Sequence, residues 1–324
     1  LDSTFAYPWN MTMGAVKDNS LIERAGKRIG QHCKQIGMQF NFAPDIDINT
    51  NPANPIIGNR SFGEDKENVA QKGLAFTRGM QSVGVLGSAK HFPGHGDTAK
   101  DSHKTLPTIN FTAKRLEEVE LYPFRALAKS VASVMVGHLN VPALEPKNGL
   151  PSSLSKTIIT DLLKKKMGYE GLIFTDALGM KGVSEYLPIG EVEVEAFLAG
   201  NDILLMPSNL PKGFEAMKKA YQSKRISEER LAHSVKKILM AKYKVGLTTF
   251  TPIDEATVSK ELHTTEDDLL TEAIFENALT VAQNKSQIIP IKQLDKQKIA
   301  YVKFGNDSGW TFYSTLKKYA DVAL

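Results

Sequence analysis

The chain has 324 residues, 42% hydrophobic and 23% charged, so it has the composition of an ordinary globular protein and is long enough for one large domain or two. Lys+Arg 40 against Asp+Glu 36 leaves a formal net charge of +4, too small and too evenly spread to indicate a nucleic-acid partner. The single cysteine, Cys33, excludes a disulfide framework and a cysteine-based zinc site, and no run approaches the roughly eighteen apolar residues of a membrane span.

Short apolar runs alternate with amphipathic patterns up to Gly246. The apolar runs predict strands over Met38–Ile48, Gly84–Phe92, Ser133–Pro142, Gly171–Ala177 and Asn201–Met206. The patterns between and after them predict helices over Ser20–Ile36, Glu67–Val83, Lys114–Ser130, Ser155–Met167, Gly190–Ala199, Gly213–Ser223 and Ser227–Val245. The last helix is the clearest, because Ser227 can cap it, Gly246 can end it, and one apolar stripe includes Val235 and Leu239.

Strands of this length, each followed by a helix, are typical of parallel βα units. Two arrangements compete: a closed TIM-like (β/α)8 barrel and an open doubly wound sheet. Polar residues at the carboxyl ends of several strands favour the barrel, where these ends converge on one mouth. They are Asp45 and Asp47, Lys90 and His91, His138, Asp176, and the Met206-Pro207 turn. A barrel needs eight strands, so two or three are expected upstream of Leu1.

The pattern changes after Gly246. We predict an N-terminally incomplete barrel domain at 1–246, a polar, Thr-rich linker at 247–265, and the truncated start of a second α/β domain at 266–324. That last range is expected to hold a helix at Glu266–Leu279, a short apolar run at Ile288–Ile291, a strand at Lys298–Phe304 and a helix at Gly309–Tyr319. Since Leu1 is not a start methionine and no signal peptide is visible, we expect an internal piece of a longer protein, with further domains beyond residue 324.

The stretch from Lys90 to His103 carries the densest chemistry, Lys-His-Phe-Pro-Gly-His-Gly-Asp-Thr-Ala-Lys-Asp-Ser-His. It holds three of the seven histidines on a backbone that glycine and proline keep irregular. Asp101 and His103 lie two residues apart, so the carboxylate can orient the imidazole as a general acid/base. Two alternatives stay open at this point: a metal site from the histidines and aspartates of the stretch, and a structural turn with a salt bridge.

Two further segments hold candidate site residues. In Gly-Leu-Ile-Phe-Thr-Asp176, an apolar strand leads straight into a carboxylate, which is either the N-cap of the next helix or a nucleophile. A carboxylate with a separate proton donor is what a retaining glycosidase needs. Arg60 lies in an ordered Asn- and Pro-rich loop, where it can hold a polar substrate group or simply pin the loop. His138 ends a strand, and Asp47 and His138 are candidate supporting residues behind the groups that contact a ligand.

Together these segments resemble glycoside hydrolase family 3, and within it the β-N-acetylglucosaminidases. The resemblance covers most of the chain, from about Asp2 to about Leu294. It rests on the Lys-His-Phe-Pro-Gly-His-Gly-Asp-Thr-x-x-Asp-Ser-His segment, Phe-Ala-Pro-x-x-Asp (Phe42 to Asp47), Gly-Asn-Arg-Ser-Phe-Gly (Gly58 to Gly63) and the Phe-Thr-Asp-Ala-Leu strand end.

The resemblance implies roles for individual residues. Asp176 stands at the position of the family's nucleophile, His103 at that of the branch's histidine acid/base, and Asp101 at that of its dyad partner. Arg60, Lys90 and His91 stand at family positions that hold the sugar hydroxyls and the acetamido group. A family aspartate that grips the sugar from an early strand is expected upstream of Leu1, so the sugar pocket is incomplete in this sequence.

The sequence therefore predicts a retaining exo-β-N-acetylglucosaminidase that needs no cofactor or metal. Its partner is a GlcNAc-containing carbohydrate such as a peptidoglycan fragment or a chitooligosaccharide, with no nucleic acid and no membrane span. The alternatives are a family 3 β-glucosidase or β-xylosidase, a GlcNAc phosphorylase, and a non-catalytic carbohydrate-binding protein. By analogy with two-domain members of the family, the expected location is periplasmic or secreted.

Overall fold

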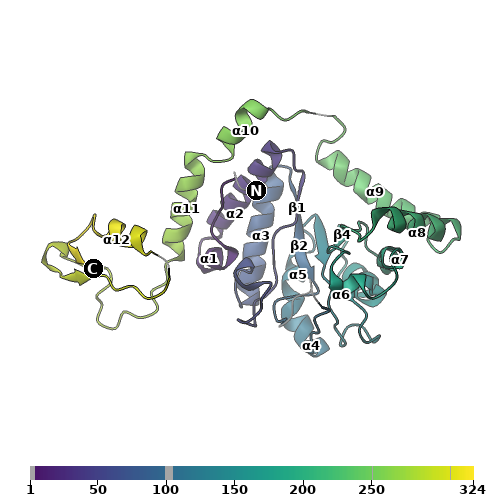
Figure 1. Ribbon diagram of the computed structural model, residues 1–324, viewed down its shortest axis with the longest axis horizontal. Helices are drawn as coiled ribbons and strands as arrows, with labels where there is room; N and C mark the ends of the chain where they lie inside the picture. The colour runs from purple at the N-terminus through teal and green to yellow at the C-terminus, as the bar shows by residue number, and fades with distance from the viewer. Residues whose placement is uncertain (1–3, 99–104, 250, 307) are drawn as a thin grey trace. The chain divides into compact units, whose positions relative to one another are not determined.

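The computed structural model of the chain describes residues 4–98, 105–249, 251–306 and 308–324. Its contacts divide the chain into two compact units, Leu1–Leu279 and Thr280–Leu324. The first unit contains a parallel sheet with helices around it, and the second contains a small βαβ unit (Figure 1).

The sheet of the first unit has four parallel strands in chain order. They are β1 (Phe40–Asn41), β2 (Leu86–Phe92), β3 (Ser133–Val136) and β4 (Leu172–Thr175). Each pairs with the next, which confirms four of the five predicted strands and the parallel βα organisation. The strands are shorter than predicted. Regular pairing of β1 stops before Pro44, which has no N–H to donate, and resumes only as an isolated bridge between Asp45 and Lys90.

The fifth predicted strand, Asn201–Met206, lies beside β4 without forming a regular ladder. Ile203 bridges Phe174 of β4, and the Thr175 N–H donates to the Ile203 carbonyl at 3.0 Å. The Leu205 N–H then donates to Thr175 Oγ1 at 2.9 Å, so a side chain replaces the backbone partner. Among the described residues the sheet is thus open, with β1 at one edge and the Asn201–Met206 segment at the other. Closure into an eight-stranded barrel stays a prediction.

The helices up to Lys244 lie close to their predicted positions, except that the short helices Asn10–Ala15 and Lys181–Ser184 were not predicted. They are α1 (Asn10–Ala15), α2 (Asn19–Gln35), α3 (Lys66–Ser82), α4 (Ala113–Arg115), α5 (Tyr122–Leu127), α6 (Lys181–Ser184), α7 (Glu191–Ala199), α8 (Leu210–Gln222) and α9 (Glu228–Lys244). π-Helical segments at Leu116–Glu120 and Thr157–Lys166 interrupt or replace the α-helix there. Ser227 accepts from the Arg230 N–H at 3.2 Å, and Gly246 ends α9 with φ 83°, which confirms both predicted boundaries.

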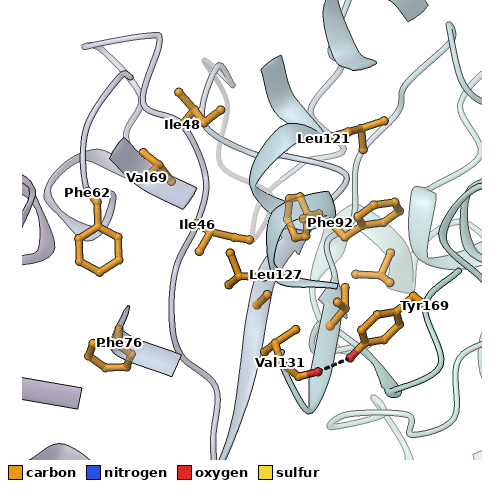
Figure 2. Close-up of a cluster of buried hydrophobic side chains, with 14 of the residues drawn as sticks. Ile46, Ile48, Phe62, Val69, Phe76, Phe92, Leu121, Leu127, Val131 and Tyr169 are labelled. Atoms are coloured by element: carbon orange, nitrogen blue, oxygen red, sulfur yellow. Dashed lines mark hydrogen bonds between the residues drawn. The ribbon is translucent and has the colours of Figure 1, made fainter. Parts of the chain in front are cut away.

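The main core lies between one face of the sheet and helices α2, α3 and α5 (Figure 1). Figure 2 shows part of it, where Ile46, Phe92 and Leu127 meet and Tyr169 Oη donates to the Val131 carbonyl at 3.3 Å. All these side chains are buried, so the central strands are held from this face by apolar packing.

Glycines set the distance between α2 and α3. A Cβ atom on Gly26 would lie 2.3 Å from the Phe76 carbonyl oxygen, and one on Gly79 would lie 1.9 Å from the Glu23 carbonyl oxygen. Neither backbone can move away without separating the helices, so both positions require glycine.

The opposite face of the sheet is aromatic. The rings of Phe40 and Phe42 each approach that of Phe174, at centroid distances of 5.1 and 5.3 Å, and α9 packs beside them through Ile238 and Ala241. The predicted apolar stripe of α9 is only partly buried, since Val235 is 43% and Leu239 58% exposed. Both line an open, largely apolar cavity of about 1110 Å³ at the start of β2 and β4.

The division between the two units falls later than the predicted domain boundary. The predicted linker contains α10 (Glu255–Glu261), and the range predicted to open the second domain contains α11 (Thr265–Ala278). This helix packs on α1 and α2, and its Leu270 and Ile274 are fully buried in the main core. The first unit therefore runs to Leu279, because the apolar stripe of α11 finds a partner surface there.

A buried carboxylate joins α11 to α2. Asp267 accepts hydrogen bonds from Arg28 Nε at 2.9 Å, Arg28 Nη2 at 2.8 Å, Tyr7 Oη at 2.5 Å and the Thr264 N–H at 2.8 Å. Burial alone would raise the pKa of Asp267, but these donors, Arg28 foremost, hold it well below its ordinary value. The carboxylate is therefore ionised and paired.

The second unit is a single βαβ unit. Strands β5 (Ile299–Ala300) and β6 (Val322–Ala323) pair in parallel, and α12 (Trp310–Leu316) connects them. The predicted strand at Lys298–Phe304 and helix at Gly309–Tyr319 are confirmed in shorter form, and Ile288–Ile291 is irregular. Among the helices that the structure describes, none has both the length and the apolar character needed to cross a lipid bilayer.

We predict that Asp267→Ala lowers the free energy of unfolding by about 3–5 kcal/mol, because it removes the buried counter-ion of the Arg28 guanidinium and leaves it the exposed Glu266, at 3.4 Å. Urea denaturation followed by circular dichroism measures the change. Asp268→Ala is the matched control, since this neighbouring side chain is 60% exposed and its contact with His263 contributes less than about 1 kcal/mol. Equal losses in the two variants would contradict the role of the buried pair.

The contribution of the Asp267 carboxylate to stability has a defined pH dependence, which a second variant, Asp267→Asn, tests. Because the pKa of Asp267 is depressed in the folded state, its contribution is fully present above the unfolded pKa of about 4. It is lost as the pH falls toward the lower, folded pKa. The difference between wild type and Asp267→Asn should therefore be largest near neutral pH and shrink in acid.

Candidate active site

Polar side chains from four neighbouring chain segments meet at the carboxyl end of the sheet. Asp47 follows β1, Lys90 and His91 belong to the end of β2, His138 follows β3, and Asp176 follows β4. Parallel strands place these ends along one edge, as the sequence predicted. Asp47, His91 and His138 are buried, and Lys90 and Asp176 are half-buried.

Asp47 organises the segment that follows β2. Its Oδ2 lies 2.7 Å from His91 Nδ1, and its Oδ1 accepts the His95 N–H at 2.6 Å. Both oxygens also lie within 3.2 Å of the His91 backbone nitrogen. One carboxylate thus fixes the backbone at two residues and also holds the His91 ring. Asp47, predicted as a supporting residue, contacts His91 directly.

Asp45 is a second buried acid beside this one. Its Oδ1 accepts the Asp47 N–H at 3.2 Å, and its Oδ2 lies 3.3 Å from Arg60 Nη2 and 4.0 Å from His91 Nδ1. Burial, with the negative charge of Asp47, raises the pKa of Asp45 to about 7. Burial likewise lowers the pKa of His91 to about 4. The sequence placed Asp45 at a strand end but did not reveal its contact with Arg60, which lies fifteen positions further along the chain.

Arg60 and Lys90 bring positive charge to the same place. Arg60 Nη1 donates to the Ile56 carbonyl at 3.1 Å while Nη2 faces Asp45, so the guanidinium both pins its own loop and enters the site. Burial lowers the pKa of Lys90, and the carboxylates of Asp45 and Asp176 oppose that shift. Asp45, Arg60 and Lys90 all line a cavity of about 300 Å³ beside β1.

Asp176 is held at the end of β4 by its neighbours. Its N–H donates to the Val136 carbonyl at 2.8 Å, and its Oδ1 accepts the Ala177 N–H at 2.8 Å. Burial would raise its pKa, but His91, His138, the Ala177 N–H and Lys90 together lower it, so the group is an ionised carboxylate. The next helix, α6, starts only at Lys181 after Met180, so Asp176 is not its N-cap and that alternative is excluded.

His138 contacts the residue that follows Asp176. Its Nε2 lies 3.0 Å from the Ala177 carbonyl oxygen, and its Nδ1 lies 2.7 Å from Ser153 Oγ. The ring is fully buried, so it supports the end of β4 from behind instead of facing solvent.

The loop after His91 is held as far as Thr98. Asn54 Nδ2 donates to the carbonyls of His95 and Gly96 at 2.9 and 3.0 Å, and Thr98 Oγ1 lies 2.7 Å from His95 Nδ1. A Cβ atom on Gly96 would lie 1.8 Å from the Ile48 carbonyl oxygen, so only glycine fits. Sequence reasoning missed Asn54, although its place between two prolines marked an ordered loop. Asp101 and His103, the predicted dyad, lie outside the described residues.

Asp45, Asp47 and His91 could each offer one ligand atom to a metal ion, since these atoms lie within 4.8 Å of one another. The donor set fits a cation poorly. Both Asp47 oxygens already accept N–H groups, and the Arg60 guanidinium and the Lys90 ammonium supply positive charge nearby. The prediction of a metal-free site is kept on this ground.

Comparison with known proteins relates the chain to a family of glycosyl hydrolases. Residues 2–241 match the model of the glycosyl hydrolase family 3 N-terminal domain. The chain is 31% identical over 321 residues to beta-hexosaminidase A of Pseudoalteromonas piscicida, an alignment that covers 90% of this chain and 54% of the relative. It is 29% identical over 291 residues to a beta-N-acetylglucosaminidase/beta-glucosidase of Cellulomonas fimi, covering 87% of this chain and 52% of the relative.

A solved structure is similar over nearly the whole chain. The glycoside hydrolase family 3 beta-N-acetylglucosaminidase from Paenibacillus sp. superposes with a TM-score of 0.84 at 35% identity, covering 99% of this chain and 63% of that one. The chain thus spans about half the length of the curated relatives it matches. Since the family model covers most of the sequence, the chain belongs to glycosyl hydrolase family 3.

Proposed function

We propose that this chain carries the catalytic machinery of a retaining exo-β-N-acetylglucosaminidase, which releases terminal β-GlcNAc from glycosides. The observation that carries the proposal is Asp176, an ionised carboxylate at the end of β4 with Lys90 and His91 beside it. A carboxylate held in this state, next to donors for sugar oxygens, suits attack on an anomeric carbon. The relatives named as hexosaminidases support the choice of an aminosugar.

In this mechanism Asp176 attacks C1 of the sugar and the bond to the leaving oxygen breaks, giving a covalent glycosyl-enzyme. His103, oriented by Asp101, donates its proton to the leaving oxygen. The same imidazole then takes a proton from water, which attacks C1, releases GlcNAc with retained configuration and restores Asp176. Arg60, Lys90 and His91 hold sugar hydroxyls and the acetamido group, and Asp47 fixes His91 for this task. No cofactor takes part.

The complete fold we propose is a (β/α)8 barrel. The open sheet edge at β1 and the apolar cavity of about 1110 Å³ beside α9 are surfaces that further strands and helices would cover. The 280–324 unit would then begin a second α/β domain. By the same analogy with two-domain members of the family, we place the protein in the periplasm or outside the cell, with peptidoglycan fragments or chitooligosaccharides as substrates.

One relative favours a second candidate function. The Cellulomonas fimi protein is named as both a beta-N-acetylglucosaminidase and a beta-glucosidase, so activity on β-glucosides is the main alternative. A neutral histidine acid/base would also tolerate phosphate as the attacking group, because it does not repel an anion. Formation of GlcNAc-1-phosphate in phosphate buffer would then reveal a phosphorylase.

The test of the proposed function compares kcat/KM of the full-length protein for nitrophenyl β-GlcNAc and nitrophenyl β-glucoside. We expect a preference for GlcNAc of about a hundredfold or more, or about 3 kcal/mol in the transition state, because the site holds the acetamido group. Activity should be unchanged by EDTA. Equal rates on both sugars, or loss with EDTA and recovery with zinc, would refute the assignment.

Removal of the nucleophile gives a second prediction. Asp176→Asn should lower kcat on every GlcNAc substrate by about 10⁴-fold, since the amide cannot form the glycosyl-enzyme. Nitrophenyl β-GlcNAc turnover measures this. Asp161→Asn is the control and should keep full activity, since Asp161 is exposed and pairs with Lys165 on the surface. A variant at position 176 that retained a tenth of the wild-type rate would exclude the nucleophile role.

The acid/base assignment is tested by the leaving group. His103→Ala should lower kcat/KM by about 10²–10⁴-fold for chitobiose, whose leaving oxygen needs a proton, and far less for dinitrophenyl β-GlcNAc. His233→Ala, on the exposed side of α9, is the control. If both substrates lost activity equally in His103→Ala, this histidine would not be the proton donor.

A further inference from the structure

Two strand ends meet through the ring of His138. The ring lies just after β3, and its Nε2 is 3.0 Å from the carbonyl oxygen of Ala177, just after β4. A carbonyl oxygen only accepts, so Nε2 carries the hydrogen and donates it. Nδ1 lies 2.7 Å from the Ser153 hydroxyl, which can donate to the ring or accept from it.

The Ser153 side of this arrangement is rigid. Ser153 belongs to a buried 3-10 turn, Ser152–Leu154, and its carbonyl accepts from Asn201 Nδ2 at 2.9 Å. Ser152 Oγ in the same turn donates to the Gly137 carbonyl at 2.7 Å and accepts the Leu139 N–H at 3.0 Å. The residues before and after His138 are thus tied to the turn that also holds its ring.

The Ala177 side leads to the candidate nucleophile. The Ala177 N–H donates to Asp176 Oδ1 at 2.8 Å, while the Ala177 carbonyl accepts from His138. The Asp176 N–H donates to the Val136 carbonyl at 2.8 Å. Residues of the β3 end therefore fix the backbone on both sides of the Asp176 side chain. The peptide that His138 holds is the one whose neighbouring N–H orients the Asp176 carboxylate through Oδ1.

We propose that His138 is a positioning residue that sets the orientation of the Asp176 carboxylate through the Ala177 peptide. This inference rests on the proposed function, in which Asp176 is the nucleophile. It assigns His138 no contact with substrate and no proton transfer.

The Leu178 and Gly179 N–H groups are held by the Leu205 and Met206 carbonyls, and the Ala177 carbonyl also accepts the Met180 N–H at 3.0 Å. If the His138 bond is lost, Met180 is the remaining donor to that carbonyl among the described residues, so the 177–178 peptide can tilt within the turn and move the carboxylate off its line of attack. A misplacement of about 1 Å costs about 10²-fold in rate.

Loss of alignment should appear in kcat and leave KM nearly unchanged. Arg60 is held by the Ile56 carbonyl and Asp45, and His91 by Asp47, so the groups that hold the sugar do not depend on His138. A general loosening of the fold would instead affect KM, kcat and thermal stability together.

The experiment compares two substitutions of His138 by amide side chains, glutamine and asparagine, each of which keeps one of the two hydrogen bonds of the ring. The amide of glutamine reaches the place of Nε2, and that of asparagine reaches the place of Nδ1. His138→Gln can still donate to the Ala177 carbonyl, whereas His138→Asn keeps only the contact with Ser153. We would measure kcat and KM of the full-length protein on nitrophenyl β-GlcNAc, with thermal unfolding of each variant. His138→Asn should lose about 10²-fold in kcat with KM changed less than about threefold, and His138→Gln should lose less than about fivefold.

The outcomes separate this inference from the proposed function. If the two variants lost kcat equally, or if the loss followed the drop in Tm, the positioning role would be wrong even with an active wild type. An inactive wild type, or an active Asp176→Asn, would instead overturn the proposed function and this inference with it. A kcat loss confined to His138→Asn, with similar Tm values for both variants, supports the role.

Discussion

The buried carboxylate of Asp47 is the contact on which the candidate site depends. It contacts the His91 ring and accepts hydrogen bonds from the backbone N–H groups of His91 and His95. These bonds fix the conformation of the irregular segment after β2. Burying a carboxylate without such donors would cost free energy of folding. Without such an acceptor, a loop rich in glycine and proline would keep many conformations. Each therefore stabilises the other. Asn54 completes the arrangement by holding the far side of the same loop through His95 and Gly96.

The charges at the strand ends balance in a way that suits the proposed chemistry. Two acids, Asp45 and Asp47, stand beside Arg60 and Lys90, and burial raises the pKa of Asp45 to about 7. Asp176 differs from them, because its neighbours lower its pKa and keep it ionised. Environment thus shifts the pKa values of carboxylates of the same kind in opposite directions. That difference supports Asp176 as the nucleophile and places Asp47 behind His91.

The same principle, a buried charge with a complete set of donors, recurs away from the site. Asp267 joins α11 to Arg28 of α2 and also bonds Tyr7. The first unit therefore includes the predicted linker and extends to Leu279. Apolar burial of Leu270 and Ile274 acts with Asp267. The boundary between the two units is therefore decided by which surface α11 covers. By contrast, the exposed apolar side chains of α9 mark a surface that the described residues leave open.

The sequence by itself determined the alternation of strands and helices, their parallel order, and the polar residues at the strand ends, because periodicity, caps and turn residues are local signals. It also indicated Asp176, Arg60, Lys90 and His91 as candidate site residues, since these lie in recognisable segments. It did not reveal the contacts that make a site of them. The Asp47–His91 pair joins residues 44 positions apart, the His138–Ala177 bond 39, and the Arg28–Asp267 pair 239. Only the tertiary structure decided these contacts, because the partners are chosen by how strands and helices pack and not by any pattern along the chain.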